Sequence, residues 1–121
     1  MRIALPDEGN WAADLWRMLD ESFAMAEAPQ IVELLRALMV EAQLDPAFGA
    51  RFRTEFLERR RTALATLVER ARQRGDLPAT LTAGFAADII FGVLWYRLLA
   101  LPQPFDQSLT NHLVALMTAV A

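Results

Sequence analysis

Apolar residues recur at helical spacing along the chain, in segments separated by short stretches rich in Pro, Gly and Asp. In the segment that begins at Pro29, apolar positions recur every three or four residues, while Glu33, Arg36 and Glu41 take the other side. This is the pattern of an amphipathic helix. No segment alternates with the period of two that a half-buried strand would show. The pattern therefore predicts an all-α domain, a five-helix orthogonal bundle with short loops.

Capping residues place the ends of these helices. Asn10, Asp45, Thr82 and Asp106 each stand just before a periodic segment, where a side-chain oxygen can accept a hydrogen bond from the first helical turn. Gly75 suits the position just past a helix end. The predicted helices follow Asn10, begin at Pro29, span 46–74 and 83–101, and follow Asp106.

The segment 84–101, GFAADIIFGVLWYRLLAL, is apolar on nearly every face. It can span a membrane, fill a core or meet another protein. A membrane span needs about 20 apolar residues with charge confined to the ends, but Asp88 lies a third of the way in and Pro102 ends the run. We therefore expect no membrane partner. Gly92 costs about 1 kcal/mol relative to Ala in a helix, which indicates a close approach by another helix, from this chain or from a second copy.

Composition narrows the function classes. The 121 residues suit one domain, 1–121, and 55% of them are apolar, which exceeds the usual share. The net charge of −3 does not provide the positive field of a nucleic-acid binder. The absence of Cys excludes disulfides, thiolate catalysis and Cys-based zinc sites, and it fits a cytoplasmic location.

Catalytic patterns are missing from the sequence. A Ser-His-acid triad would need His112 with Ser22 or Ser108, and no nucleophile-elbow sequence surrounds either Ser. One His cannot supply the two Glu-x-x-His pairs of a di-metal bundle, and no glycine-rich phosphate loop is present. We predict that the chain is not an enzyme and that it uses no metal or cofactor.

The C-terminal half, RARQRGDLPATLTAGFAADIIFGVLWYRLLALPQPFDQSLTNHLVALMTAV, resembles the C-terminal half of TetR-type transcriptional repressors. The resemblance lies in a long helix ending in R-G-D-L, a helix with a central Gly followed by W-Y-R-L-L, a Pro-bounded turn and a final apolar-striped helix. Upstream, PDEGNWAADL and LLRALMVEAQLDPAF resemble earlier helices of the same domain. The resemblance covers nearly the whole chain.

The resemblance implies a homodimer that binds a small apolar effector and thereby controls an N-terminal helix-turn-helix. That DNA reader is absent from this sequence, so we expect a fragment or a product of an internal start, with no direct DNA binding by the chain as given. Operator DNA is a partner expected only of a full-length form.

The last two helices are expected to form the dimer surface, as an intersubunit four-helix bundle across a twofold axis. The alternative is that their apolar residues fill the core of a single chain. The interface candidates are Phe85, Ile89, Gly92, Leu113, Leu116, Met117 and Val120.

The resemblance also places an effector pocket among the first four helices, where aromatic and Met side chains suit an adaptable apolar cavity. The alternative is ordinary core. The effector-binding candidates are Trp16, Leu19, Phe23, Met39, Phe52, Phe56, Phe91 and Trp95.

The charged residues have no assigned role in binding. The basic run Arg59–Arg61 is interpreted as a solvated helix face, and Asp88 and Arg97 are expected to meet partners across the bundle.

Two other functions compete with effector binding. One is a structural dimerisation module that binds no ligand, and the other is a helical enzyme of unrecognised type.

Overall fold

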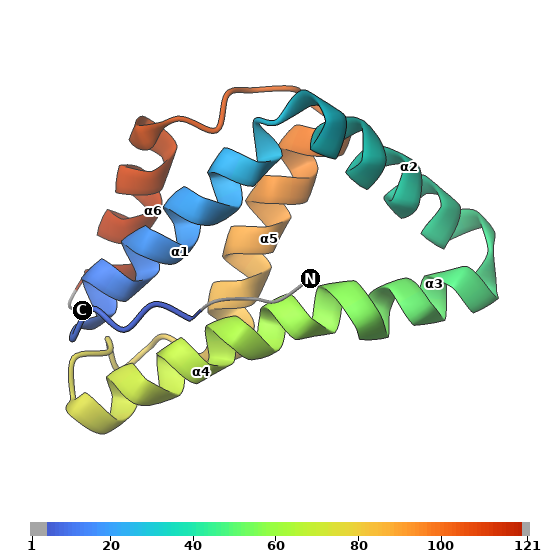
Figure 1. Ribbon diagram of the computed structural model, residues 1–121. Helices are drawn as coiled ribbons and strands as arrows, with labels where there is room; N and C mark the ends of the chain where they lie inside the picture. Colours follow the sequence, from blue (N-terminus) through green and yellow to red (C-terminus); the bar gives the residue numbers. More distant parts are fainter. Residues whose placement is uncertain (1–4, 120–121) are drawn as a thin grey trace.

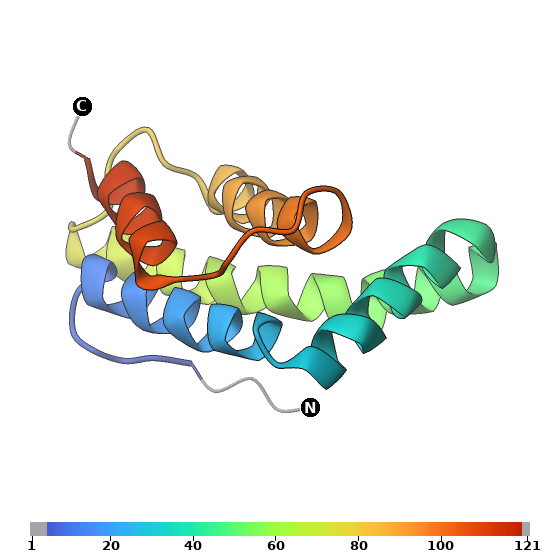
Figure 2. The same cartoon turned by 90° about the horizontal axis from the view of Figure 1, so that it is seen from above.

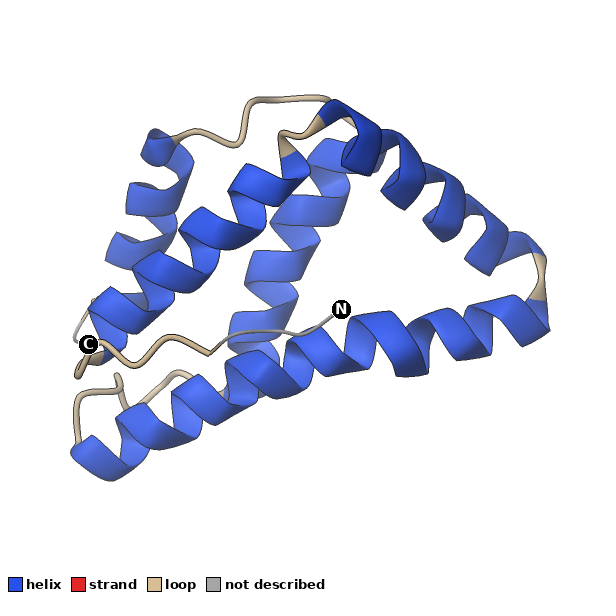
Figure 3. Cartoon of the chain, in the orientation of Figure 1, coloured by secondary structure: helices blue, strands red, loops and turns tan. Residues whose placement is uncertain are grey.

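The computed structural model describes residues 5–119, and all the regular structure in that range is helical (Figure 3). The elements are α1 (Trp11–Ala26), α2 (Pro29–Leu44), α3 (Pro46–Phe52), the π-helical turn η1 (Arg53–Leu57), α4 (Glu58–Arg74), α5 (Ala83–Leu99) and α6 (Gln107–Thr118). The predicted all-α fold is confirmed. The long helix predicted over 46–74 is present as α3, η1 and α4 joined end to end.

The predicted caps form the helix starts. The side chains of Asn10, Asp45, Thr82 and Asp106 each accept a hydrogen bond from a backbone N–H within the next three residues. Gly75 follows α4 with a φ of 82°, a left-handed conformation that glycine adopts without steric penalty. These local hydrogen bonds explain why the starts of the helices are readable from sequence.

The end of α5 differs from the prediction. The helix ends at Leu99 instead of residue 101. The amides of both Ala100 and Leu101 donate to the carbonyl of Tyr96, at 2.9 and 3.1 Å, which closes the last turn. Pro102 disfavours helical geometry in the residue before it, so the helix stops early.

The helices form two layers and an arm (Figures 1 and 2). One layer holds α5 and α6, and the other holds α1 and α4. Helix α6 packs on α1, and α5 packs on α4. Helices α2 and α3 form a hairpin that extends past the end of the layers, and α2 also contacts α1 and α5.

The core lies between the two layers and is almost wholly apolar. Trp11 is buried at the start of α1, and its indole Nε1 donates to the carbonyl of Met117 at 3.0 Å, which fixes α6 against α1. Within residues 5–119, no helix has both the length and the apolar character that crossing a bilayer would require. The largest fully buried apolar side chains are Trp11, Leu15, Leu19, Leu64, Leu67, Val68, Ile90, Phe23 and Leu98.

A buried carboxylate joins the start of α1 to the end of α4. Asp14 has no exposed surface, and its Oδ1 accepts a hydrogen bond from the amide of Glu8 at 2.7 Å. Its Oδ2 lies 3.5 Å from Nη2 of Arg74, which is also 3.5 Å from Oδ2 of Asp76. Asp76 in turn accepts a hydrogen bond from the amide of Trp11 at 2.7 Å. The network anchors the segment before α1.

We predict that Asp14→Ala lowers the free energy of unfolding by about 1–3 kcal/mol, because it leaves the part-buried amide of Glu8 without its acceptor and removes one of the two carboxylates beside Arg74. Urea unfolding measures the change. The control is Asp20→Ala on the same helix, where Asp20 has no ion pair or side-chain hydrogen bond among the described residues. Equal stabilities of the two variants would contradict this role for Asp14.

The hairpin between α2 and α3 depends on a glycine. Gly49 is buried, and a Cβ placed on it would overlap the backbone carbonyl of Ala42 in α2. Because the obstacle is backbone, a side chain can be accommodated only by moving α3 away from α2. The close approach therefore requires glycine at this position.

We expect Gly49→Ala to destabilise the domain by about 1–3 kcal/mol, the usual effect of overpacking. The matched control is Gly84→Ala in α5, where the nearest atom to the added Cβ is Nη2 of Arg61 at 4.0 Å. That variant should be neutral or up to about 1 kcal/mol more stable. Thermal unfolding by circular dichroism distinguishes the two, and an unaffected Gly49 variant would refute the steric argument.

Candidate functional site

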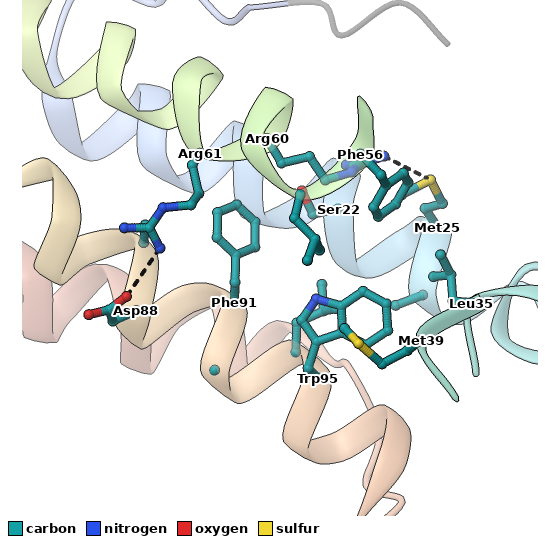
Figure 4. Close-up of a pocket in the computed structure, with 15 residues that line it drawn as sticks. Ser22, Met25, Leu35, Met39, Phe56, Arg60, Arg61, Asp88, Phe91 and Trp95 are labelled. Atoms are coloured by element: carbon teal, nitrogen blue, oxygen red, sulfur yellow. Dashed lines mark hydrogen bonds and ion pairs between the residues drawn. The ribbon is translucent and has the colours of Figure 1, made fainter. Parts of the chain in front are cut away.

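A cavity of about 360 Å³ lies between α1, α2, α5 and the helix formed by η1 and α4 (Figure 4). Its walls are mainly aliphatic, aromatic and Met side chains, with a few polar groups. The lining residues are Ser22, Met25, Ala26, Leu35, Met39, Phe56, Leu57, Arg60, Arg61, Ala87, Asp88, Phe91, Gly92, Leu94 and Trp95.

One sector of α5 supplies a wall of this cavity. Phe91 and Trp95 are four residues apart, so they lie one above the other on the same face of the helix. The neighbouring sector, which includes Ile90 and Leu98, is buried in the core. The cavity therefore adjoins the core along the length of α5.

The π-helical turn supplies another wall. Phe56 and Leu57 lie at its end, and Arg60 and Arg61 follow one turn later on the same face. The rings of Phe52 and Phe56 stack with centroids 5.2 Å apart and planes at 11°. The edge of Trp95 meets Phe52 at 6.3 Å, so the aromatic side chains of two helices support each other beside the cavity.

Arg60 lies over an aromatic ring in this wall. Its guanidinium carbon is 4.7 Å from the centroid of Phe56, and its Nη2 is 3.9 Å from Sδ of Met25. Burial lowers the pKa of Arg60 below its ordinary value, because desolvation disfavours the charged form. The basic run was expected to form a solvated face. This holds for Arg59, which is exposed, and is wrong for Arg60.

An ion pair connects α4 and α5 on the other side of the cavity. Nη1 of Arg61 lies 3.1 Å from Oδ1 of Asp88, and the two side chains are 41% and 71% exposed. Pairs this exposed contribute less than about 1 kcal/mol to stability. Asp88 thus finds its partner within the chain, and Arg97 donates to the carbonyl of Pro104 at 2.7 Å, in the loop before α6.

The predicted effector-binding residues separate into two groups. Met39, Phe56, Phe91 and Trp95 line the cavity, and Phe52 packs beside it. The other three lie outside the lining. Trp16 reaches α6, where its Nε1 donates to Oδ1 of Asn111 at 3.2 Å. Leu19 lies in the core. The ring of Phe23 packs on the ring of Phe105, with centroids 5.2 Å apart.

The face of α1 that lines the cavity contains none of the predicted effector-binding residues. Ser22, Met25 and Ala26 line it, at the three- and four-residue spacing of one helical face. The sequence prediction favoured the largest side chains, and on α1 these lie in the core or against α6. The three- and four-residue spacing of Ser22, Met25 and Ala26 is the sequence feature that could have identified this cavity-lining face.

The predicted interface residues also separate. Phe85 and Leu116 are 59% and 61% exposed, and Ile89 is partly exposed. Gly92 is exposed, and a Cβ added to it would meet nothing within 4 Å, although it also borders the cavity. Leu113 and Met117 are buried in the core of the chain itself, since α6 packs on α1. Val120 lies outside the described residues.

Other exposed apolar residues extend this surface. Tyr96 and Leu99, at 59% and 45% exposure, continue the outer face of α5 beyond Phe85 and Gly92. We call this surface the outer face; it consists of the partly exposed Ile89 and the exposed Phe85, Tyr96, Leu99 and Leu116.

Comparisons with known proteins agree with this architecture. Residues 5–117 match the family model described as "Tetracyclin repressor-like, C-terminal domain". The chain is 30% identical over 116 residues to an uncharacterized HTH-type transcriptional regulator, YdeS, of Bacillus subtilis, covering 93% of the chain and 57% of that protein. It is 25% identical over 109 residues to the uncharacterized HTH-type transcriptional regulator Rv1556 of Mycobacterium tuberculosis, covering 90% of the chain and 53% of that protein.

A solved structure shows the same fold. The TetR family transcription regulator SCO0332 superposes with a TM-score of 0.84 at 27% identity, over 98% of the chain and 65% of that structure. The chain spans about half the length of the curated relatives it matches. The relatives are transcription regulators rather than enzymes. The chain therefore belongs to the family of tetracycline repressor-like C-terminal domains of TetR-type regulators.

Proposed function

We propose that this regulatory domain binds a small, largely apolar effector in the cavity and forms a homodimer through the outer face, and that effector binding controls DNA binding by a full-length cytoplasmic regulator. The observation that carries the proposal is the placement of cavity and outer face on adjoining sectors of α5. Phe91 and Trp95 face the cavity, whereas Phe85 and Tyr96 face outward.

The cavity has the size and walls of a small-molecule site. Its volume of about 360 Å³ falls within the roughly 300–1,000 Å³ of typical ligand sites. Met25 and Met39 are unbranched and can adjust to the shape of a ligand. Apolar walls with a small number of polar groups provide affinity and orientation together.

The outer face has the character of a helix-packing surface. Large apolar side chains exposed together mark interaction sites in soluble proteins. A groove of about 220 Å³ runs between the start of α5 and the end of α6, bordered by Phe85, Ile89 and Leu116. No described residue lies within 4 Å of a Cβ placed on Gly92, so a helix of a second copy can approach there. Helices α5 and α6 of two copies would then form a four-helix bundle.

Coupling follows from the rigidity of a helix. An effector that packs against Phe91 and Trp95 favours one position of α5, and the outer face moves with it. The effector and a particular dimer geometry then stabilise each other, which is the reciprocal coupling that defines allostery.

Occupation of the cavity is tested by blocking it. We expect neutral apolar compounds to change the tryptophan emission and raise the melting temperature of the unmodified chain. Ser22→Phe places a ring in the cavity and should weaken binding at least about tenfold, or roughly 1.4 kcal/mol. Ala24→Phe, on the exposed side of the same helix, should bind as the unmodified chain does. If no compound changes emission or melting temperature, the domain is a structural dimerisation module.

Dimerisation is tested by charging the outer face. We expect the unmodified chain to scatter light as a particle of twice its 13.6 kDa mass at micromolar concentration. Leu116→Arg should reduce that mass to the monomer value, because it places a charge in an apolar contact. Leu44→Arg, at a residue of α2 that is 74% exposed, should leave the dimer intact. A monomeric unmodified chain would rule out this interface.

A further inference from the structure

A second hollow lies on the arm formed by α2 and α3. It has a volume of about 240 Å³, and its lining comes from α2, α3 and η1. Its walls are mainly apolar, and the exposed ion pair between Arg51 and Glu55, at 3.9 Å, supplies its charged groups. We call this hollow the arm groove; it is lined by Leu38, Phe48, Arg51, Phe52, Glu55 and Phe56.

The arm groove and the cavity adjoin at one side chain. Among the described residues, Phe56 is common to the two linings. Its neighbours in the sequence divide between them, since Glu55 lines the arm groove and Leu57 lines the cavity. On α2, Leu38 likewise lines the arm groove and Met39 lines the cavity. The boundary between the two hollows therefore runs through Phe56.

Two contacts hold the ring of Phe56 in place. Phe52 stacks on it, with ring centroids 5.2 Å apart and planes at 11°. The guanidinium carbon of Arg60 lies 4.7 Å from the centroid of the Phe56 ring. Phe52 is itself buried, and it meets the edge of Trp95 at 6.3 Å. Because aromatic and cation–π contacts favour specific ring orientations, Phe56 is a fixed wall.

This wall stands at one end of the cavity lining. Figure 4 shows Phe56 and Met25 on the opposite side of the drawn residues from Asp88. At about 30 Å³ for each water-sized group, the cavity of about 360 Å³ holds roughly a dozen non-hydrogen atoms, and the arm groove would add roughly eight. A chain of about ten carbons therefore fits the cavity alone, whereas one of about fourteen needs the space beyond Phe56.

We propose that Phe56 is the specificity-determining residue that limits the length of the effector, because its ring closes the cavity toward the arm groove. The ligand class is then an unbranched neutral apolar chain that ends before this ring. This inference rests on the proposed function, and it adds the length of the ligand and the residue that sets it. Removing the ring would join the two hollows into one longer site.

The test compares decanol with tetradecanol, each delivered from a cyclodextrin complex, by the change in tryptophan emission. Each methylene group moved from water into an apolar site strengthens binding about fourfold. Tetradecanol should nevertheless bind the unmodified chain no more tightly than decanol, because its additional carbons find no room in the cavity. Ser22→Phe should weaken the binding of both alcohols, which places them in the cavity.

A matched pair of variants assigns the wall. In Phe56→Ala the two hollows are joined, so tetradecanol should bind at least about tenfold more tightly than decanol. Phe48→Ala removes the same ring from the arm groove and leaves the wall in place, because Phe48 does not line the cavity. That variant should keep the affinity ratio of the unmodified chain.

A double variant identifies the space that the longer alcohol enters. Adding Leu38→Trp to Phe56→Ala fills the arm groove with a large side chain. The gain for tetradecanol should then disappear while decanol binding is retained, since Leu38 does not line the cavity. A gain that persists in the double variant would overturn the role of the arm groove.

The outcomes separate the length limit from the proposed function. If neither alcohol binds the unmodified chain, effector binding in the cavity is refuted together with the length limit. If both bind and tetradecanol binds the unmodified chain more tightly than decanol, the length limit alone is refuted, and this comparison needs no variant to fold. No gain for tetradecanol in Phe56→Ala, or an equal gain in Phe48→Ala, would overturn the assignment to Phe56.

Discussion

The domain is organised by the need to cover a helix that is apolar around most of its circumference. Helix α5 buries one sector, including Ile90 and Leu98, against the core. Its second sector, with Phe91 and Trp95, forms a wall of the cavity. Its third sector stays exposed, with Tyr96 among its members. Because apolar surface is driven out of water, each sector requires a different cover, and among the described residues the core covers only the first. In the proposed function, an effector and a second copy would cover the other two.

Two charged side chains of this domain, Asp14 and Arg60, are wholly or partly buried. The carboxylate of Asp14 is fully enclosed and meets a backbone amide and Arg74, so its burial is compensated within the chain and it stabilises the junction of α1 and α4. Arg60 is partly buried beside the cavity, where its guanidinium rests on the ring of Phe56. Each charge is thus held by specific contacts within the chain, because burying a charge without such contacts is costly.

Much of the fold could be predicted from the sequence because helix starts are local. Asn10 and Asp106 form their capping hydrogen bonds within three residues, so their role depends on no distant contact. The site was less predictable. Periodicity shows that one face of the last helix is covered, but it does not show that α1 covers Met117. Likewise, charge suggested that Arg60 faces water, although its long stem packs along an aromatic ring. The covering element is a property of tertiary packing, which spacing along one chain does not encode.

The π-helical turn Arg53–Leu57 has a consequence for how this chain tolerates changes in length. Each residue of an α-helix rotates the chain by about 100°, and the wide turn absorbs one additional residue between α3 and α4. Deleting a single residue there would restore uniform winding and leave the helix from Glu58 onward facing its present neighbours. The loss of one residue should therefore be tolerated better in this turn than within α4, where it would rotate the rest of the helix by about 100°. The loop of residues 100–106 has no helical winding to preserve and is free to change in length.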